Sequence, residues 1–210
     1  MYLHRDQAYE LLQAHKQGLL TSLRGSHSFL NQLLDGDDWS FVIKAQVLIE
    51  GSVTQAVLAQ IGDERLKKTI DLMPLTGDKV SKLGLTRDLG LLTKNQRRFV
   101  KRMASLRNLL AHRVENVDFT FEGYVASLDT SVRRDWQESI VWFTDTSQSR
   151  EVWFRLAIEH ARAVIYLGTF LLVATLAVNG SEKEALREIG IAAETTTREL
   201  LDSLPLPGET

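Results

Sequence analysis

Residues 94–112 read KNQRRFVKRMASLRNLLAH, and this stretch constrains the fold more than any other. Neither proline nor glycine interrupts it, so the sequence predicts one helix over about 94–111. At about 100° per residue, its apolar and basic side chains separate onto two faces. The apolar face carries Phe99, Val100, Met103, Leu106 and Leu110, and the basic face carries Lys94, Arg97, Arg98, Lys101 and Arg102.

Arg107 and His112 end this segment and belong to neither face. Arg107 falls at the border of the apolar stripe, beside Val100 and Met103. A guanidinium held there keeps its charge and needs partners. Two interpretations are open. Either Arg107 anchors a buried ion pair while His112 caps the helix, or the two side chains form a functional site.

A second helix is predicted over about 39–61, and it is apolar around much of its circumference, so we expect it to be central. Glu50 interrupts it, and a carboxylate in such a helix is costly unless it is paired. We expect Arg107 to be its partner, with His112 as a second possibility. The alternative is that Glu50 faces solvent on a polar strip shared with Lys44 and Gln46.

The remaining segments are mostly helical in pattern. We predict helices over 5–24, 27–34, 63–73, 78–91, 131–140, 149–178 and 181–203, and a brief strand within 116–121. In the 78–91 helix, Val80, Leu83 and Leu85 are expected to turn inward. Trp136 and Trp142 are expected to be core aromatics, with a stacking platform for bases as the alternative.

Residues 163–178, AVIYLGTFLLVATLAV, are uncharged, but a membrane span needs about 20 apolar residues. We therefore expect a helix buried within the subunit or in a subunit interface, and no membrane. The chain has a net charge of -2 and no cysteine, which excludes disulfides and argues against a basic coat for nucleic acid. The N-terminus lacks a signal-peptide pattern, so a cytoplasmic protein is expected. Its histidines show no ligand spacing, so we predict neither a metal nor a cofactor.

The pattern Arg107-Asn108-x-x-Ala111-His112 resembles the signature of the HEPN superfamily of helical domains. The order of elements over about 35–178 looks like the mannitol operon repressor family, whose members share that fold. The resemblance implies an all-α bundle with long central helices, and a homodimer in which two Arg–His sites face each other. Residues 1–203 would form one domain, with added N- and C-terminal helices, and 204–210 a flexible tail.

Two functions follow from the resemblance. In the first, the chain is a metal-independent endoribonuclease with Arg107, Asn108, His112 and Glu50 in its site, and the 94–102 basic face guides RNA. In the second, it is a non-catalytic regulator that represses transcription by binding protein or nucleic acid. An antitoxin or another regulatory protein is then a possible partner.

Overall fold

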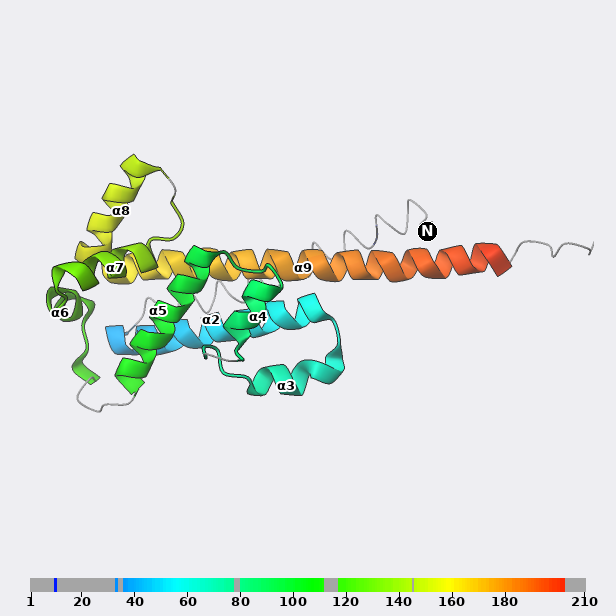
Figure 1. The fold of residues 1–210 in the computed structure, drawn as a ribbon, viewed down its shortest axis with the longest axis horizontal. Coiled ribbons are helices and arrows are strands. Elements are labelled where there is room, and N and C mark those ends of the chain that lie inside the picture. Colours follow the sequence, from blue (N-terminus) through cyan, green and yellow to red (C-terminus); the bar gives the residue numbers. More distant parts are fainter. Residues whose placement is uncertain are drawn as a thin grey trace, which may run out of the picture.

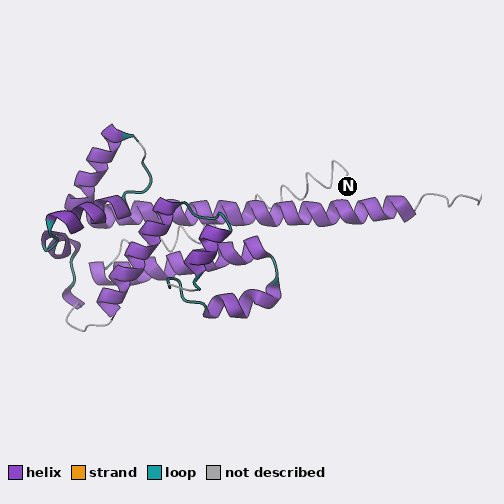
Figure 2. Cartoon of the chain, in the orientation of Figure 1, coloured by secondary structure: helices purple, strands orange, loops and turns teal. Residues whose placement is uncertain are grey.

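The structure is a computed structural model that describes residues 10, 33, 36–77, 80–111, 117–144 and 146–202. Every regular element among these residues is helical, which confirms the predicted all-α class (Figure 2). In chain order the elements are α2 (Asp38–Ile61), η1 (Glu64–Leu66), α3 (Lys67–Leu72), α4 (Lys82–Asp88), α5 (Lys94–Ala111), α6 (Phe121–Ala126), α7 (Thr130–Ile140), α8 (Ser147–Glu159) and α9 (Ala161–Asp202).

Helices α2 and α9 form the centre of the molecule and run side by side in the same direction (Figure 1). Near their N-termini, Arg162 of α9 pairs with Asp38 of α2 at 3.3 Å. Near the end of α2, a Cβ on Gly180 would lie 3.7 Å from Ala59. Their facing side chains are fully or almost fully buried and make the main apolar seam; among them are Val42, Ile49, Val53, Ile165, Leu172 and Leu176.

The ends of α2 are set by local sequence. The Asp37 carboxylate caps the N-terminus by accepting a hydrogen bond from the Ser40 N–H at 2.7 Å. This contact is the main reason that the pKa of Asp37 lies below its ordinary value. At the other end Gly62 takes the left-handed conformation, with φ of 67°, and donates its N–H to the Leu58 carbonyl. The helix therefore has the bounds expected from the sequence to within one residue.

Helix α5 crosses α2 and packs on α7 (Figure 1). Its bounds, Lys94–Ala111, are those predicted. The five residues assigned to its apolar face are all buried: Phe99, Val100, Met103, Leu106 and Leu110. The short helix predicted over 63–73 is also present as η1 and α3 and ends before Pro74.

The helix boundaries predicted for the C-terminal third of the chain were wrong. The predicted 149–178 helix ends at Glu159, where His160 leaves helical geometry with φ of -137° and ψ of 48°. The break lets α8 turn back on α7, where Trp136 Nε1 donates to the Ala157 carbonyl at 3.0 Å. Conversely, the boundary predicted between residues 178 and 181 does not exist, and α9 runs unbroken through Ser181. The glycine at this point, Gly180, costs the helix only about 1 kcal/mol.

Two smaller predictions were also wrong. The expected strand within 116–121 is absent from its described part: Val117 and Asp118 lie in a 3₁₀ turn, and α6 begins at Phe121. There the Asp38 carboxylate accepts from the Phe121 N–H at 2.8 Å, so a tertiary contact fixes the helix start. The predicted 78–91 helix is α4 alone. Leu83 is buried as expected, whereas Val80 precedes the helix and is 62% exposed.

The helices predicted at 5–24 and 27–34 and the tail at 204–210 lie outside the described residues, apart from Glu10 and Leu33. Two helices, Asp38–Ile61 and the Ala161–Leu200 stretch of α9, are long and apolar enough to cross a membrane by length and composition. Core helices of soluble proteins pass the same test, so this observation weighs little, and the absence of a membrane stays a prediction.

Candidate functional site at the end of helix α5

Arg107 lies in the last turns of α5, and its side chain is half-buried. Its Nη1 donates to Oδ1 of the adjacent Asn108 at 2.9 Å, an exposed contact. Within the part of the chain that the structure describes, no carboxylate lies within ion-pair distance of Arg107. Among the described residues, the guanidinium is thus oriented by a neutral amide and not by a carboxylate.

The predicted pairing of Glu50 with Arg107 is wrong, because Glu50 pairs with Lys82. Lys82 Nζ lies 3.2 Å from Glu50 Oε1, and the lysine side chain is only 4% exposed. A buried ammonium needs a counter-charge more than the half-exposed guanidinium does, and the first turn of α4 brings it to Glu50. The alternative of a solvent-facing polar strip is correct only in part, because Lys44 is exposed and Glu50 is one-third exposed, whereas Gln46 is buried.

His112 lies outside the described residues. The structure therefore brings together Arg107 and Asn108, pairs Glu50 with Lys82 instead, and leaves the predicted role of His112 as a prediction. The helical backbone from Arg107 to Ala111 does show that the segment leading to His112 follows helical geometry.

The basic face of α5 is largely engaged by acidic residues of α7. Arg98 lies 2.5 Å from Asp135 Oδ1 and 3.0 Å from Glu138 Oε2. Arg102 pairs with Asp135 and also donates to the Ser139 hydroxyl at 3.1 Å. The contact with Arg98, followed by that with Arg134, holds the pKa of Glu138 below its ordinary value.

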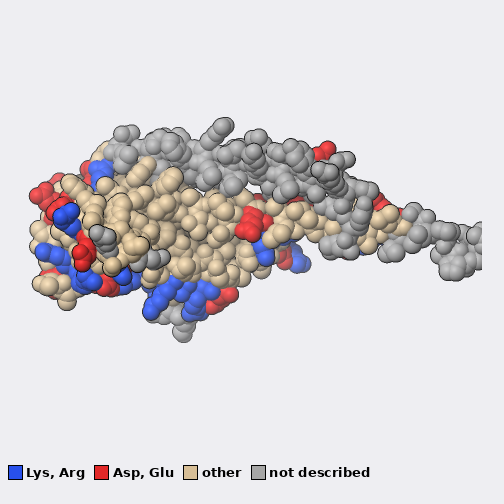
Figure 3. Space-filling model, turned by 90° about the horizontal axis from the view of Figure 1, so that it is seen from above, with Lys and Arg blue, Asp and Glu red and all other residues tan. Residues whose placement is uncertain are grey.

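Of the five residues assigned to this face, Lys94 and Lys101 are exposed, and Arg97 donates to the Leu92 carbonyl. Figure 3 shows red and blue side chains next to one another at the end of the molecule opposite the projecting helix, and a mainly blue patch at the lower edge of the same view. Opposite charges in contact cancel much of the field that would attract a polyanion. Ion pairs with α7 thus engage Arg98 and Arg102, whereas Lys94 and Lys101 are exposed, and nucleic-acid binding by this face stays a prediction.

The two tryptophans take different positions. Trp136 is fully buried and hydrogen-bonded to the Ala157 carbonyl, so it is a core residue as predicted. Trp142 is half-buried and lies against Phe99, with ring centroids 6.3 Å apart. It packs at the edge of the core and presents no open platform for bases.

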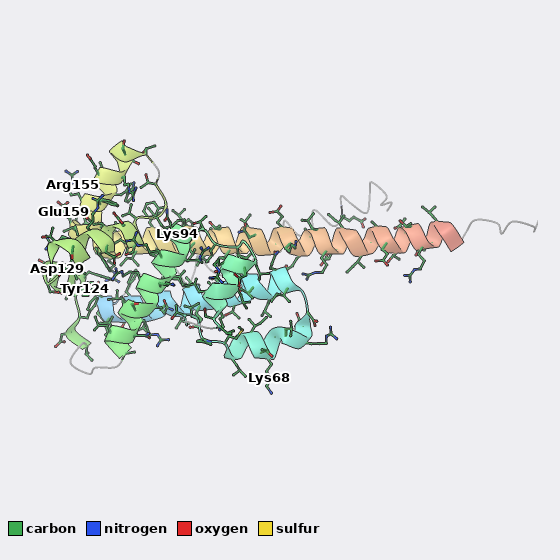
Figure 4. All side chains as sticks on the ribbon, viewed as in Figure 1. Lys68, Lys94, Tyr124, Asp129, Arg155 and Glu159 are labelled. Carbon is green, nitrogen blue, oxygen red and sulfur yellow. The ribbon has the colours of Figure 1, made fainter. Side chains whose placement is uncertain are left out.

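The structure also has a cleft that the sequence did not suggest. It measures about 770 Å³ and opens where α6, α7 and the α8–α9 junction meet the start of α2. Figure 4 shows Glu159 of α8 at the same end of the molecule as Tyr124 of α6 and Asp129, the residue before α7. The acidic and basic side chains of the lining are Asp38, Glu122, Arg133, Glu159, His160 and Arg162.

The two arginines of this cleft make hydrogen bonds and an ion pair to other residues of the chain. Arg162 donates to the Gly36 and Leu33 carbonyls at 2.9 and 3.1 Å and pairs with Asp38. Arg133 donates to the Leu128 carbonyl at 3.3 Å. These contacts give the cleft walls a structural role. The helix break at His160 creates the cleft, and no sequence pattern predicted that break.

Among the described residues, no group of three or more His, Asp or Glu side chains is placed to hold a metal ion. Four of the five histidines, His4, His15, His27 and His112, lie outside those residues, so the absence of a metal stays a prediction.

No family model, no curated protein and no solved structure matches the chain. The resemblance to HEPN domains therefore stays a prediction from the sequence.

Proposed function

We propose that the chain is a HEPN-like helical protein that acts on RNA at the end of α5, as a metal-independent endoribonuclease. The observation that supports this most is the state of Arg107. Its guanidinium is half-exposed, held by Asn108 at 2.9 Å, and without a carboxylate partner among the described residues. A guanidinium so placed is suited to bind phosphate oxygens with two parallel hydrogen bonds.

In this proposal His112 takes the proton from a ribose 2′-hydroxyl, whose oxygen then attacks the adjacent phosphorus. The bond from phosphorus to the 5′-oxygen breaks, and that oxygen leaves with a proton supplied by an acid, leaving a 2′,3′-cyclic phosphate. A histidine near its ordinary pKa can serve as base or acid at neutral pH. Arg107 stabilises the charge that develops on the phosphate oxygens, and Asn108 orients the guanidinium.

The test is incubation of end-labelled single-stranded and structured RNA with the purified chain in EDTA. The variants are His112→Ala and Arg107→Ala, and the matched control is Ser105→Ala, an exposed residue of the same helix that belongs to neither the site nor the basic face. We expect wild type and Ser105→Ala to cut, and both site variants to lose at least about a hundredfold in rate, as expected for removal of a catalytic acid, base or oxyanion donor. Cleavage that persists in His112→Ala would refute the proposal.

A second function, a non-catalytic regulator that works by contact with another macromolecule, is favoured by a different observation. The arginines of the α5 face pair with Asp135 and Glu138, so few free cations remain to form an RNA track. Under this function the chain cuts no RNA. Any nucleic-acid binding should depend weakly on salt, with a log–log slope of about 2 or less from Lys94 and Lys101. Fluorescence anisotropy over a salt series measures that slope.

A further inference from the structure

The side of α9 that packs on α2 continues beyond the end of α2. Arg187 donates to the Ala59 carbonyl at 2.7 Å, which places the end of α2 beside this part of α9. From there α9 extends to Asp202, and Figure 1 shows this part projecting beyond the other labelled helices. About 15 residues of helix, or about 22 Å at 1.5 Å per residue, thus have no part of α2 to pack on.

One stripe of this projecting segment combines charge with an exposed apolar residue. Spacings of three and four residues put its members on one face, the continuation of the side that packs on α2. Ile191 at its centre is 60% exposed. A Cβ added to the neighbouring Gly190 would meet nothing within 4 Å, so the space beside Ile191 is open. We call this the α9 stripe: Glu184, Arg187, Ile191, Glu194 and Arg198.

The charges of the α9 stripe are self-complementary in one direction only. Read along the chain, they run acidic, basic, apolar, acidic, basic. Two copies laid antiparallel with Ile191 against Ile191 oppose Glu184 to Arg198 and Arg187 to Glu194, which gives four opposite-charge pairs by symmetry. Within one chain Arg187 also donates to the Ala59 carbonyl and Arg198 lies 3.6 Å from Glu194, so these side chains would share their contacts with the second copy. In a parallel pair in register, each charged residue faces the same residue of the second copy, so that like charges are opposed. Charge order therefore selects both the direction and the register of pairing.

We propose that the α9 stripe binds the same stripe of a second copy of the chain, as an antiparallel helix pair with a two-fold axis at Ile191. The interface is isologous, as a closed dimer requires. It is short, so it lies at the low end of interface sizes, and its ion pairs are exposed. We therefore expect a concentration-dependent dimer that weakens as salt is raised. This surface is remote from Arg107, and the proposal does not depend on the RNA-directed function.

The test is sedimentation equilibrium of the full chain over a concentration series at low and high salt. Two charge variants separate this proposal from dimerisation elsewhere. One carries Glu184→Arg with Glu194→Arg, which makes the stripe wholly basic. The other carries Arg187→Glu with Arg198→Glu, which makes it wholly acidic. Each alone should raise the dimer dissociation constant by about tenfold or more, whereas an equimolar mixture should restore dimerisation as a heterodimer.

A third test variant is Ile191→Asp, and its matched control is Leu186→Asp. Leu186 is 57% exposed on the same helix but lies on another face. We therefore expect Ile191→Asp to disrupt the dimer and Leu186→Asp to leave it intact. Circular dichroism of each variant establishes that α9 remains helical. A wild-type chain that stays monomeric throughout the series would overturn the proposal. So would a dimer that survives both charge variants, which would place the interface on another surface.

Discussion

The two halves of α9 belong to one continuous helix but are buried to different extents. In the first half, residues 161–180, Ile165 and Leu172 are fully buried in the seam with α2. In the second, residues 181–202, Leu186 and Ile191 are more than half exposed, although Ala193 and Thr196 are buried. Continuity of the helix is thus set by backbone propensity and the absence of proline, whereas burial is set by whether a neighbour lies alongside. Two pairs of substitutions test this difference, and a third pair compares the start of the second half, which reaches α2, with its far end.

The largest effect is expected from leucine truncation. Leu172→Ala removes a fully buried side chain and should lower the free energy of unfolding by about 2–5 kcal/mol. Leu186→Ala, in the exposed half, should change it by at most about 0.5 kcal/mol. Urea denaturation of both variants at equal protein concentration measures the two values. Equal losses would show that the second half is packed as closely as the first.

Glycine substitution gives the second contrast. A Cβ on Gly168 would lie 3.2 Å from Trp142 Nε1 and 3.3 Å from two Phe99 ring carbons, so Gly168→Val should cost about 1–3 kcal/mol through overpacking. Gly190 has open space around it, and Gly190→Ala should stabilise the chain by about 0.5–1 kcal/mol, because glycine is entropically costly in a helix. Thermal unfolding followed by circular dichroism should therefore shift in opposite directions. A rise for both variants would argue against close packing at Gly168.

The smallest contrast is between two arginines. Arg187 reaches back to the Ala59 carbonyl at the end of α2, and Arg187→Ala should cost about 0.5–1.5 kcal/mol, the net value of a hydrogen bond. Arg198 forms an exposed pair with Glu194 at 3.6 Å, one helical turn away, and Arg198→Ala should cost no more than about 0.5 kcal/mol. Denaturation at low protein concentration keeps dimerisation out of both measurements. A larger loss for Arg198→Ala would contradict this ranking.

The sequence predicted α5 and its buried face correctly because every local signal agreed over that segment. No breaker interrupts it, and its apolar residues recur at helical spacing. The break at His160 was missed because it depends on tertiary contacts of α8 with α7. Asn179-Gly180-Ser181 was interpreted as a boundary, yet its propensity cost is too small to stop a helix with favourable residues on both sides.

In the candidate site, too, local patterns were predicted correctly and contacts between helices were not. The unusual position of Arg107 was evident from its angle on the helix, but the partner of Glu50 was not, because Lys82 comes from a different helix. Likewise the basic face of α5 was correct as a local pattern, and its neutralisation by α7 was missed. A usable signal existed, since Asp135 and Glu138 are three residues apart and share a face of the predicted 131–140 helix.

The parallel pairing of α2 with α9 has a consequence for how the chain folds. Hydrogen bonds and ion pairs across or beside this seam join residues 124 to 129 positions apart. Contacts of such long range form late, because the chain between them must be ordered first. During synthesis at roughly 5–20 residues per second, α2 would wait about 6–25 s for α9 to be made. Over that interval its apolar residues lack their main partner, so we expect the nascent chain to aggregate readily or to bind chaperones.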